Sequence, residues 1–172
     1  MVSLIFCGDL RFCPYVKRYT ERLDLANCPY EVLFWNRSGS ELELPSNYYW
    51  FNTPSDEAQN KISKLFDFIK FRKWVKKHLK KHKCDGIVVL STLPGILLFD
   101  VLKRFKKKYI FDIRDYSYEH ISFFKKIEEK VIDNSYFTSI SSKGFQAFLP
   151  EHKYVIAHNF NRGEIIEDVK FK

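Results

Sequence analysis

Residues 86–115, GIVVLSTLPGILLFDVLKRFKKKYIFDIRD, contain the pattern that decides the fold. Two short apolar runs, Gly86–Leu90 and Tyr109–Ile113, have the length and composition of buried strands. The segment between them predicts a helix that opens at Pro94 and continues to about Lys107, because proline suits the first turn of a helix. A strand, a helix and a second strand in this order form the repeating unit of a parallel sheet.

The same alternation extends to both ends of the chain. Further strands are predicted at residues 2–7, 30–35, 48–51, 136–140 and 154–157, and further helices at residues 14–28, 56–83, 118–132 and 143–149, the second of them capped by Asp56. This pattern predicts an α/β Rossmann-like domain, with a mostly parallel sheet of about six or seven strands and helices on both faces. We expect the domain to occupy residues 1–160, and residues 161–172 to begin an interdomain linker or a tail.

The composition fits one globular domain. The chain has 172 residues, of which 45% are hydrophobic, within the range of about 100–200 residues for a domain. The longest uncharged stretch, Gly86–Phe99, is shorter than the roughly 18–20 apolar residues of a membrane-spanning helix. Asp9 and Arg11 interrupt the N-terminus before a signal-like region forms. The four cysteines show no C-x-x-C pattern. We therefore expect a reduced, cytoplasmic protein.

The net charge of +8 is concentrated in the middle of the chain. Residues 61–108 carry 15 basic and 3 acidic side chains, which predicts one positive face. Within the long predicted helix, Ile62, Leu65, Phe66 and Ile69 share one face, which we expect to be ordinary core contact. Phe68, Phe71, Val75 and Leu79 form a second stripe opposite a basic arc. That stripe either packs on the sheet, which we favour, or lies on an anionic membrane; in both cases the lysines can attract anionic lipid.

Polar residues follow the predicted strands, at the edge where ligands bind in open α/β sheets. They are Gly8, Asp9, Arg11, Ser91, Thr92, Asp112, Arg114, Asp115, Glu119, Ser141, Ser142, His158 and Asn159. The charged group at 112–115 either has a function or forms a salt-bridge cluster that holds its loop. Simpler structural roles are open for others: Gly8-Asp9 as a strand-to-helix turn, and Ser141 and Ser142 as helix caps. We expect no metal site and no cofactor, because no His, Cys or Asp grouping has ligand spacing, and there is no G-x-S-x-G elbow for a catalytic triad.

Five segments in order resemble a known family. GDLRFCPYVKRY, YEVLFWNR, YIFDIRDYSYE, FTSISSKGFQAFLP and YVIAHNFN, within residues 1–161, are similar to the N-terminal half of bacterial GT-B glycosyltransferases. The resemblance is to the family 4-like type that builds capsular and other surface polysaccharides.

The resemblance implies a function and roles for the edge residues. It implies an acceptor-binding domain, joined to a second Rossmann-like domain that holds the nucleotide-sugar, in an enzyme that transfers a hexosyl group without a bound metal. The acceptor would be a glycan, often linked to a polyprenyl diphosphate. Asp112, Arg114 and Asp115 would be catalytic, and substrate would contact Gly8, Asp9, Arg11, Ser91, Thr92, Glu119, Ser141, His158 and Asn159.

The sequence also departs from the family pattern. Arg114 occupies a position where many relatives carry a histidine, and Gly8-Asp9-Leu10 replaces a pair of glycines. The donor-binding domain, with its pair of glutamates, is not in this sequence, so we expect the chain to be inactive alone.

The sequence is therefore compatible with three functions. The first is the acceptor-binding domain, held at the anionic inner face of the plasma membrane by the basic segment. The second is a non-catalytic subunit that recruits a partner to the membrane. The third, a nucleic-acid-binding domain, is disfavoured because the aromatic residues fall at core positions and do not alternate with Lys and Arg.

Overall fold

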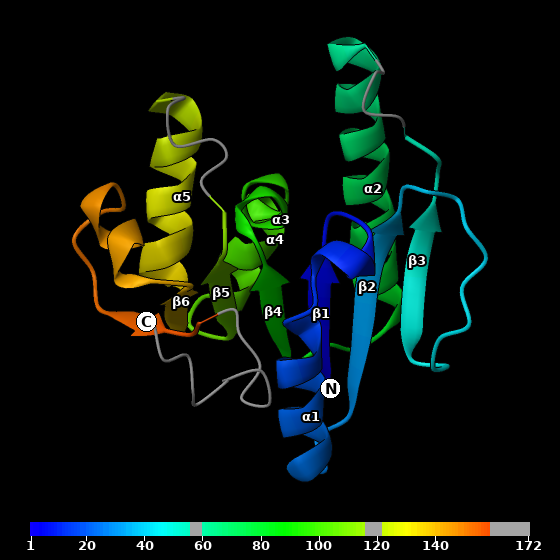
Figure 1. Ribbon diagram of the computed structural model, residues 1–172, viewed down its shortest axis with the longest axis horizontal. Coiled ribbons are helices and arrows are strands. Elements are labelled where there is room, and N and C mark those ends of the chain that lie inside the picture. The colour runs from blue at the N-terminus through cyan, green and yellow to red at the C-terminus, as the bar shows by residue number, and fades with distance from the viewer. Residues whose placement is uncertain (56–59, 116–121, 159–172) are drawn as a thin grey trace, which may run out of the picture.

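Seven parallel strands form one sheet in the computed structural model, which describes residues 1–55, 60–115 and 122–158. Their spatial order is β3-β2-β1-β4-β5-β6-β7 (Figure 1). The bounds are β1 Val2–Phe6, β2 Tyr30–Asn36, β3 Tyr48–Asn52, β4 Gly86–Leu90, β5 Tyr109–Ile113, β6 Phe137–Ile140 and β7 Tyr154–Ile156. The order reverses between β1 and β4, which confirms the predicted Rossmann-like α/β fold.

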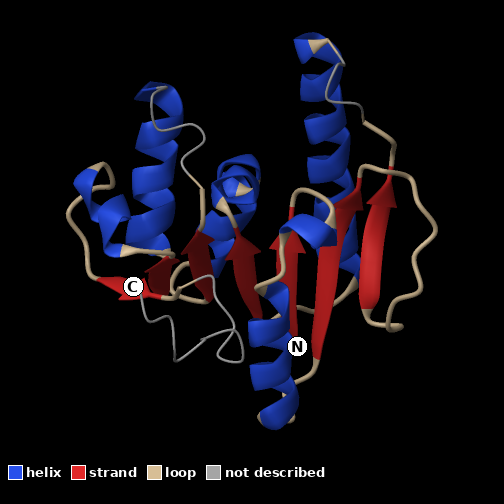
Figure 2. Cartoon of the chain, in the orientation of Figure 1, coloured by secondary structure: helices blue, strands red, loops and turns tan. Residues whose placement is uncertain are grey.

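Helices cover both faces of the sheet unequally. In Figure 2, α1 lies in front of the sheet and the other α-helices lie behind it. The bounds are α1 Val16–Leu25, α2 Lys61–Lys81, α3 Thr92–Leu97, α4 Phe99–Leu102 and α5 Ser122–Asn134, with 3₁₀ turns η1 Leu10–Phe12, η2 Lys103–Phe105 and η3 Lys143–Ala147. The face behind the sheet is thus covered by α2 to α5 and the face in front by α1.

Two predicted helix boundaries are wrong. The segment after β4 begins its helix at Thr92, before Pro94, and divides into α3, α4 and η2. The apolar residues of Leu93–Leu102 fall on every side of a helix, so their periodicity does not reveal such breaks. The cap of α2 is Asn60, whose side chain accepts a hydrogen bond from the Ile62 amide at 3.0 Å; Asp56 lies outside the described residues.

The core consists of two clusters, one on each face of the sheet. Alternate residues of the strands point to opposite faces. Ile5, Leu33 and Phe111 pack with α2 to α5, while Leu4 and Val32 pack with α1. All five side chains are fully buried. The sheet is therefore apolar on both faces, which is the condition for a parallel sheet.

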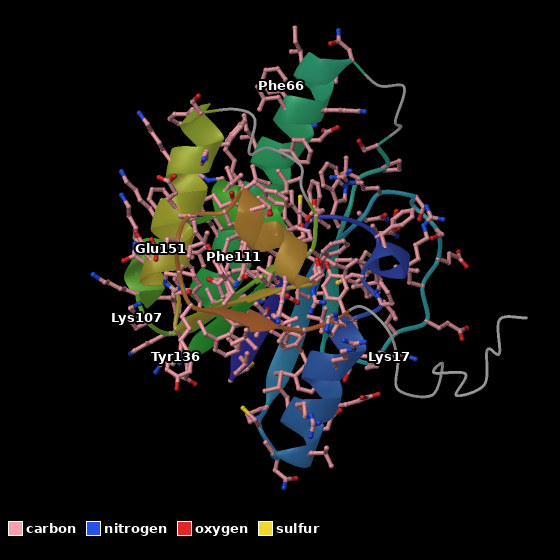
Figure 3. All side chains as sticks on the ribbon, turned by 60° about the vertical axis from the view of Figure 1, so that its left-hand side comes forward. Lys17, Phe66, Lys107, Phe111, Tyr136 and Glu151 are labelled. Carbon is pink, nitrogen blue, oxygen red and sulfur yellow. The ribbon has the colours of Figure 1, made fainter. Side chains whose placement is uncertain are left out.

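The first turns of α2 project beyond the sheet. The helix has 21 residues, or about 31 Å at 1.5 Å per residue, whereas a five-residue strand spans about 17 Å. Ile62, Leu65 and Phe66 are 63%, 57% and 58% exposed, and Figure 3 shows Phe66 at this projecting end. The prediction that they form ordinary core contacts is wrong; we call these three residues the α2 tip.

The second stripe of α2 packs on the sheet, as the favoured alternative predicted. Phe71 and Val75 are fully buried, and Phe68 and Leu79 pack against the same core. Part of the opposite basic arc is paired: Arg72 and Lys76 contact Asp100 at 3.0 and 2.6 Å. The exposed remainder includes Lys73, Lys77, Lys80, Lys81 and Lys83. None of the described helices has the length and apolarity needed to cross a bilayer.

Candidate functional site

A cleft of about 500 Å³ opens where β1 and β4 end, at the point where the strand order reverses. This is the position at which open α/β sheets bind ligands. We call it the switch-point cleft. Its polar and aromatic lining includes Gly8, Tyr15, Arg37, Ser91, Arg114 and Asp115. Four of these, Gly8, Ser91, Arg114 and Asp115, were predicted from the sequence as site residues, and the fold brings them together.

Ser91 has an unusual backbone conformation on the cleft wall. Its φ is +81° and its ψ is 164°, a region that only glycine adopts without strain. The Ser91 amide donates to the carbonyl of Asp112 at 2.8 Å, and the Ser91 side chain makes no capping bond to α3. Thr92, the next residue, donates instead to Glu128 of α5 at 3.3 Å and is buried. Ser91 thus lines the cleft, whereas Thr92 contacts α5.

Asp112 and Arg114 form a buried ion pair beneath the cleft. Arg114 Nε lies 2.8 Å from Asp112 Oδ1, and the two side chains are 4% and 0% exposed. Ser139 Oγ donates to the same carboxylate oxygen at 2.6 Å. This geometry is that of a structural salt bridge that holds the loop after β5. It corresponds to the second of the two roles that the sequence left open for the charged group at 112–115.

The guanidinium of Arg114 has further fixed contacts. It lies over the ring of Tyr15, 4.7 Å from the centroid, and donates to the carbonyl of Ala157 at the end of β7. Burial opposes the charge of Arg114, but the neighbouring Asp112 carboxylate outweighs it and raises the pKa of the guanidinium. Arg114 therefore stays charged and links β5, α1 and the end of β7. The catalytic roles of Asp112, Arg114 and Asp115 stay predictions.

Asp9 and Arg11 lie at a second hollow of about 350 Å³ beside the cleft. Asp9 is 8% exposed and accepts hydrogen bonds from Ser38 Oγ at 3.2 Å and from Arg11 Nη2 at 3.4 Å. We call this the Asp9 hollow. Gly8 lines both this hollow and the switch-point cleft. A Cβ on Gly8 would approach the Phe6 ring at 3.1 Å, so a larger residue would crowd the wall between them.

Arg37, a residue missed in the sequence reasoning, also lines both hollows. Its Nη2 donates to the carbonyl of Cys7 at 3.1 Å, and its guanidinium lies over the rings of Trp35 and Phe68 at 4.3 and 5.3 Å. Among the described residues, Arg37 makes no ion pair with a carboxylate. Its position in the sequence is nevertheless a signal, because Arg37 follows β2 directly and lies at the same edge of the sheet as the predicted residues.

The remaining predicted site residues lie elsewhere. His158 is exposed and lines a hollow between α1 and β7, where its carbonyl accepts from Arg18. Ser141 is half-buried after β6, and Ser142 precedes η3 without a side-chain capping bond. Glu119, Asn159 and the predicted linker at residues 161–172 lie outside the described residues. The predicted residues thus fall into the switch-point cleft, the Asp9 hollow and the α1–β7 side.

Cys7 and Cys13 near the cleft are poor nucleophiles. All four cysteines are free thiols. Burial raises the pKa of Cys7 to about 12 and that of Cys13 to about 12. Thiolates are the reactive form of cysteine, so these two side chains are inert packing groups near neutral pH.

One group of metal-ligand side chains occurs in the described part of the chain. Glu31, His78 and His82 place their ligand atoms within 4.8 Å of one another. The spacing of ligand residues along the sequence does not predict this group, because Glu31 belongs to β2 and lies 47 residues before His78. The group lies away from the switch-point cleft, at the amino end of β2.

Comparisons with known proteins support the fold. No family model matches the sequence, and no curated protein matches it. Among solved structures, the chain is similar to sucrose-phosphate synthase from Thermosynechococcus elongatus, with a TM-score of 0.64 and 13% sequence identity. The match covers 91% of this chain and 47% of that one, so the present chain spans about half the length of its structural neighbour.

Proposed function

We propose that this chain is the acceptor-binding half of a glycosyltransferase, which receives a glycan acceptor for sugar transfer from a nucleotide-sugar. The similarity over 47% of a sucrose-phosphate synthase, itself a GT-B glycosyltransferase, carries the proposal. In this view the switch-point cleft receives the acceptor. A second domain binds the nucleotide-sugar, and this chain alone does not transfer sugar. The whole enzyme would be a hexosyltransferase of surface polysaccharide synthesis.

The chemistry of the switch-point cleft suits an acceptor glycan. Sugar hydroxyls need both donors and acceptors of hydrogen bonds. Asp115 supplies a carboxylate, Ser91 a hydroxyl and Arg37 a guanidinium on the cleft wall. Under this proposal Asp115 accepts a hydrogen bond from the acceptor hydroxyl, while Asp112 positions Arg114. Arg114 in turn orders the walls contributed by α1 and β7.

Ligand titration followed by NMR tests the proposal on the chain as it is. The probes are a uridine-diphosphate sugar and a short-chain polyprenyl diphosphate bearing one sugar. We expect the lipid-linked sugar to shift the amide resonances of Gly8, Ser91 and Asp115, and to leave that of Lys107, at the opposite end of the sheet, unchanged. Shifts that are absent, or that spread equally to Lys107, would contradict an acceptor site at the cleft.

A matched pair of carboxylate variants sharpens this test. Asp115→Asn changes a cleft residue, and Asp133→Asn changes an exposed residue of α5. Loss of one charge-assisted hydrogen bond costs about 1.5–3 kcal/mol, or about 10- to 100-fold in affinity. We expect this loss for Asp115→Asn and no change for Asp133→Asn. Equal affinities in both variants would remove Asp115 from the site.

We also propose that the domain works at an anionic membrane surface, where a lipid-linked acceptor lies. The exposed lysines of α2 and the apolar α2 tip both support this. Sedimentation with phosphatidylcholine vesicles, with and without phosphatidylglycerol, tests it at low and physiological salt. We expect salt-sensitive binding to the anionic vesicles alone. Charge reversal of Lys73 and Lys77 should abolish it, whereas Phe66→Ser should weaken it only if the tip inserts.

A second candidate is a non-catalytic subunit that recruits a catalytic partner. Exposed apolar surface favours it, because such patches mark interaction sites. The α2 tip and Phe123 of α5, which is 68% exposed, provide such surface. The NMR titration separates the two functions, since a pure recruiting subunit would bind neither sugar probe at the cleft.

A further inference from the structure

We infer that Glu31, His78 and His82 bind one divalent transition-metal ion such as Zn²⁺, at a site separate from the switch-point cleft. The three ligand atoms lie within 4.8 Å of one another. A tetrahedral zinc ion holds neighbouring ligands about 3.3–3.6 Å apart, given bonds of about 2.0–2.2 Å. To close the site around an ion, the ligand atoms farthest apart have to approach by about 1.2–1.5 Å, and the stacked rings of His78 and His82 have to turn toward a common point.

The last turn of α2 sets the two imidazoles in register. His78 belongs to this turn, and His82, four residues later, is the residue that caps the C-terminus of α2, so the two lie one above the other. Their rings are parallel, with an interplanar angle of 5° and centroids 4.2 Å apart. Two histidines in this spacing on a helix are a recurrent zinc-binding element. The end of a helix also favours a cation, because the backbone carbonyls there carry partial negative charge.

Glu31 completes the ligand set from the neighbouring strand. Figure 1 shows α2 running behind β2 and β3 and opposite to them in direction. Its last turn therefore reaches the amino end of β2, where Glu31 lies. The Glu31 carboxylate is 2% exposed, and its Oε2 lies 2.8 Å from His78 Nε2. A buried carboxylate needs a cation or strong hydrogen bonds, and a divalent ion would neutralise it more fully than one imidazole.

The surroundings of the three ligands resemble the outer shell of a metal site. Ser3 Oγ donates to Glu31 Oε1 at 2.7 Å, which leaves Oε2 directed toward His78. Such hydrogen bonds orient metal-binding carboxylates. The ring of Tyr49 lies 4.7 Å from that of His78 and 5.8 Å from that of His82, forming an apolar wall.

Cys84 lies near this group but is not part of the ligand set. Its Sγ donates to the carbonyl of Gly86 at 2.8 Å. Two imidazoles and one carboxylate then leave room for water at the remaining position, as in three-ligand zinc sites. The bound ion would join α2 to β2, two elements distant in the sequence.

Metal titration of the whole chain tests the inference. We expect one Zn²⁺ or Co²⁺ per chain by isothermal calorimetry, visible absorption of tetrahedral Co²⁺, and a Tm that rises with metal concentration. His82 is only half-buried, so His82→Ala should keep the fold and lose on the order of 100-fold or more in affinity. Ser3→Ala should weaken binding about 10- to 100-fold through the carboxylate.

Matched controls decide between this site and adventitious binding. His152→Ala, in the loop before β7, and Cys84→Ser should both bind Co²⁺ as tightly as the unchanged chain. Absence of a one-to-one complex, or equal binding by His82→Ala and His152→Ala, would overturn the inference. Loss of binding in Cys84→Ser would overturn the proposed ligand set.

Discussion

Replacing Asp112 by asparagine should destabilise the fold more than any other change of similar size near the cleft. The substitution keeps the shape of the side chain but removes the charge that faces Arg114 at 2.8 Å. Both side chains are at least 96% buried, so water cannot replace the lost partner. Breaking a buried ion pair costs about 3–5 kcal/mol, since it leaves one charge uncompensated.

This magnitude is large against the total stability of a domain, which is about 5–15 kcal/mol. For a domain of this length, each kcal/mol lowers Tm by about 2–4 °C, so Asp112→Asn should lower Tm by about 6–20 °C. Urea unfolding followed by circular dichroism measures the free energy of unfolding directly. Asp133→Asn, at an exposed position of α5, is the control and should change it by less than about 0.5 kcal/mol.

A double-mutant cycle separates the ion pair from other effects of the substitution. Arg114→Gln alone should cost about as much as Asp112→Asn, because it strands the carboxylate instead of the guanidinium. The double variant should be more stable than the sum of the two losses by about 2–3 kcal/mol, near the upper end of pairwise couplings. Additive losses, or a loss below about 1 kcal/mol for Asp112→Asn, would refute the assignment of this pair as the internal link of the site.

Three further predictions concern the backbone and the thiols. Ser91→Gly should relieve the backbone strain at φ +81° and raise the free energy of unfolding by about 1 kcal/mol. It should also reduce affinity for the lipid-linked sugar. A variant less stable than the unchanged chain would contradict the strain argument. Gly95→Ala should cost about 1–3 kcal/mol in urea unfolding, because its Cβ would lie 2.7 Å from a buried ring of β5; an unchanged midpoint would show that the ring can move. At pH 8, Cys28 should react first with a thiol reagent, because it is only half-buried. Cys7 and Cys13 have pKa values of about 12 and should react only on unfolding. Rapid labelling of all three cysteines would contradict the burial of Cys7 and Cys13.

The sheet could be predicted from the sequence because its strands are short apolar runs between clear breaks. Gly86–Leu90 and Tyr109–Ile113 have the same bounds in the structure as in the prediction. Such runs form buried strands in almost any parallel arrangement, since both faces of each strand need apolar side chains. Local composition therefore decided this part of the fold.

The exposure of the α2 tip could not be predicted in the same way. Helical periodicity shows that Ile62, Leu65 and Phe66 share a face, but not where that face lies relative to the end of the sheet. The position of α2 along β2 and β3 depends on tertiary packing, in which Phe71 and Val75 are buried and the first turns are not. Sequence periodicity thus identified both stripes and correctly favoured packing of the second on the sheet, but it wrongly placed the first stripe in the core as well.

In the candidate site, too, the sequence predicts which residues lie at the site but not which residues contact one another. The positions of Gly8, Ser91 and Asp115 after predicted strands correctly indicated that these residues lie at one cleft. It could not show that Arg114 is held by Asp112 and Ala157, because these partners depend on how β5 and β7 end in space. Glu31 and His78 likewise meet only because α2 returns along β2.

The distribution of charge at the cleft has a consequence for the choice of ligand. Arg114 is almost fully buried, and the Asp112 carboxylate 2.8 Å away compensates its positive charge within the protein. Arg37, in contrast, contacts a neutral carbonyl and two aromatic rings, and makes no ion pair among the described residues. A guanidinium of this kind retains its ability to bind a phosphate oxygen. Arg37 lies between the switch-point cleft and the Asp9 hollow. Of the two arginines, it is therefore Arg37 that gives the proposed acceptor site its attraction for a diphosphate.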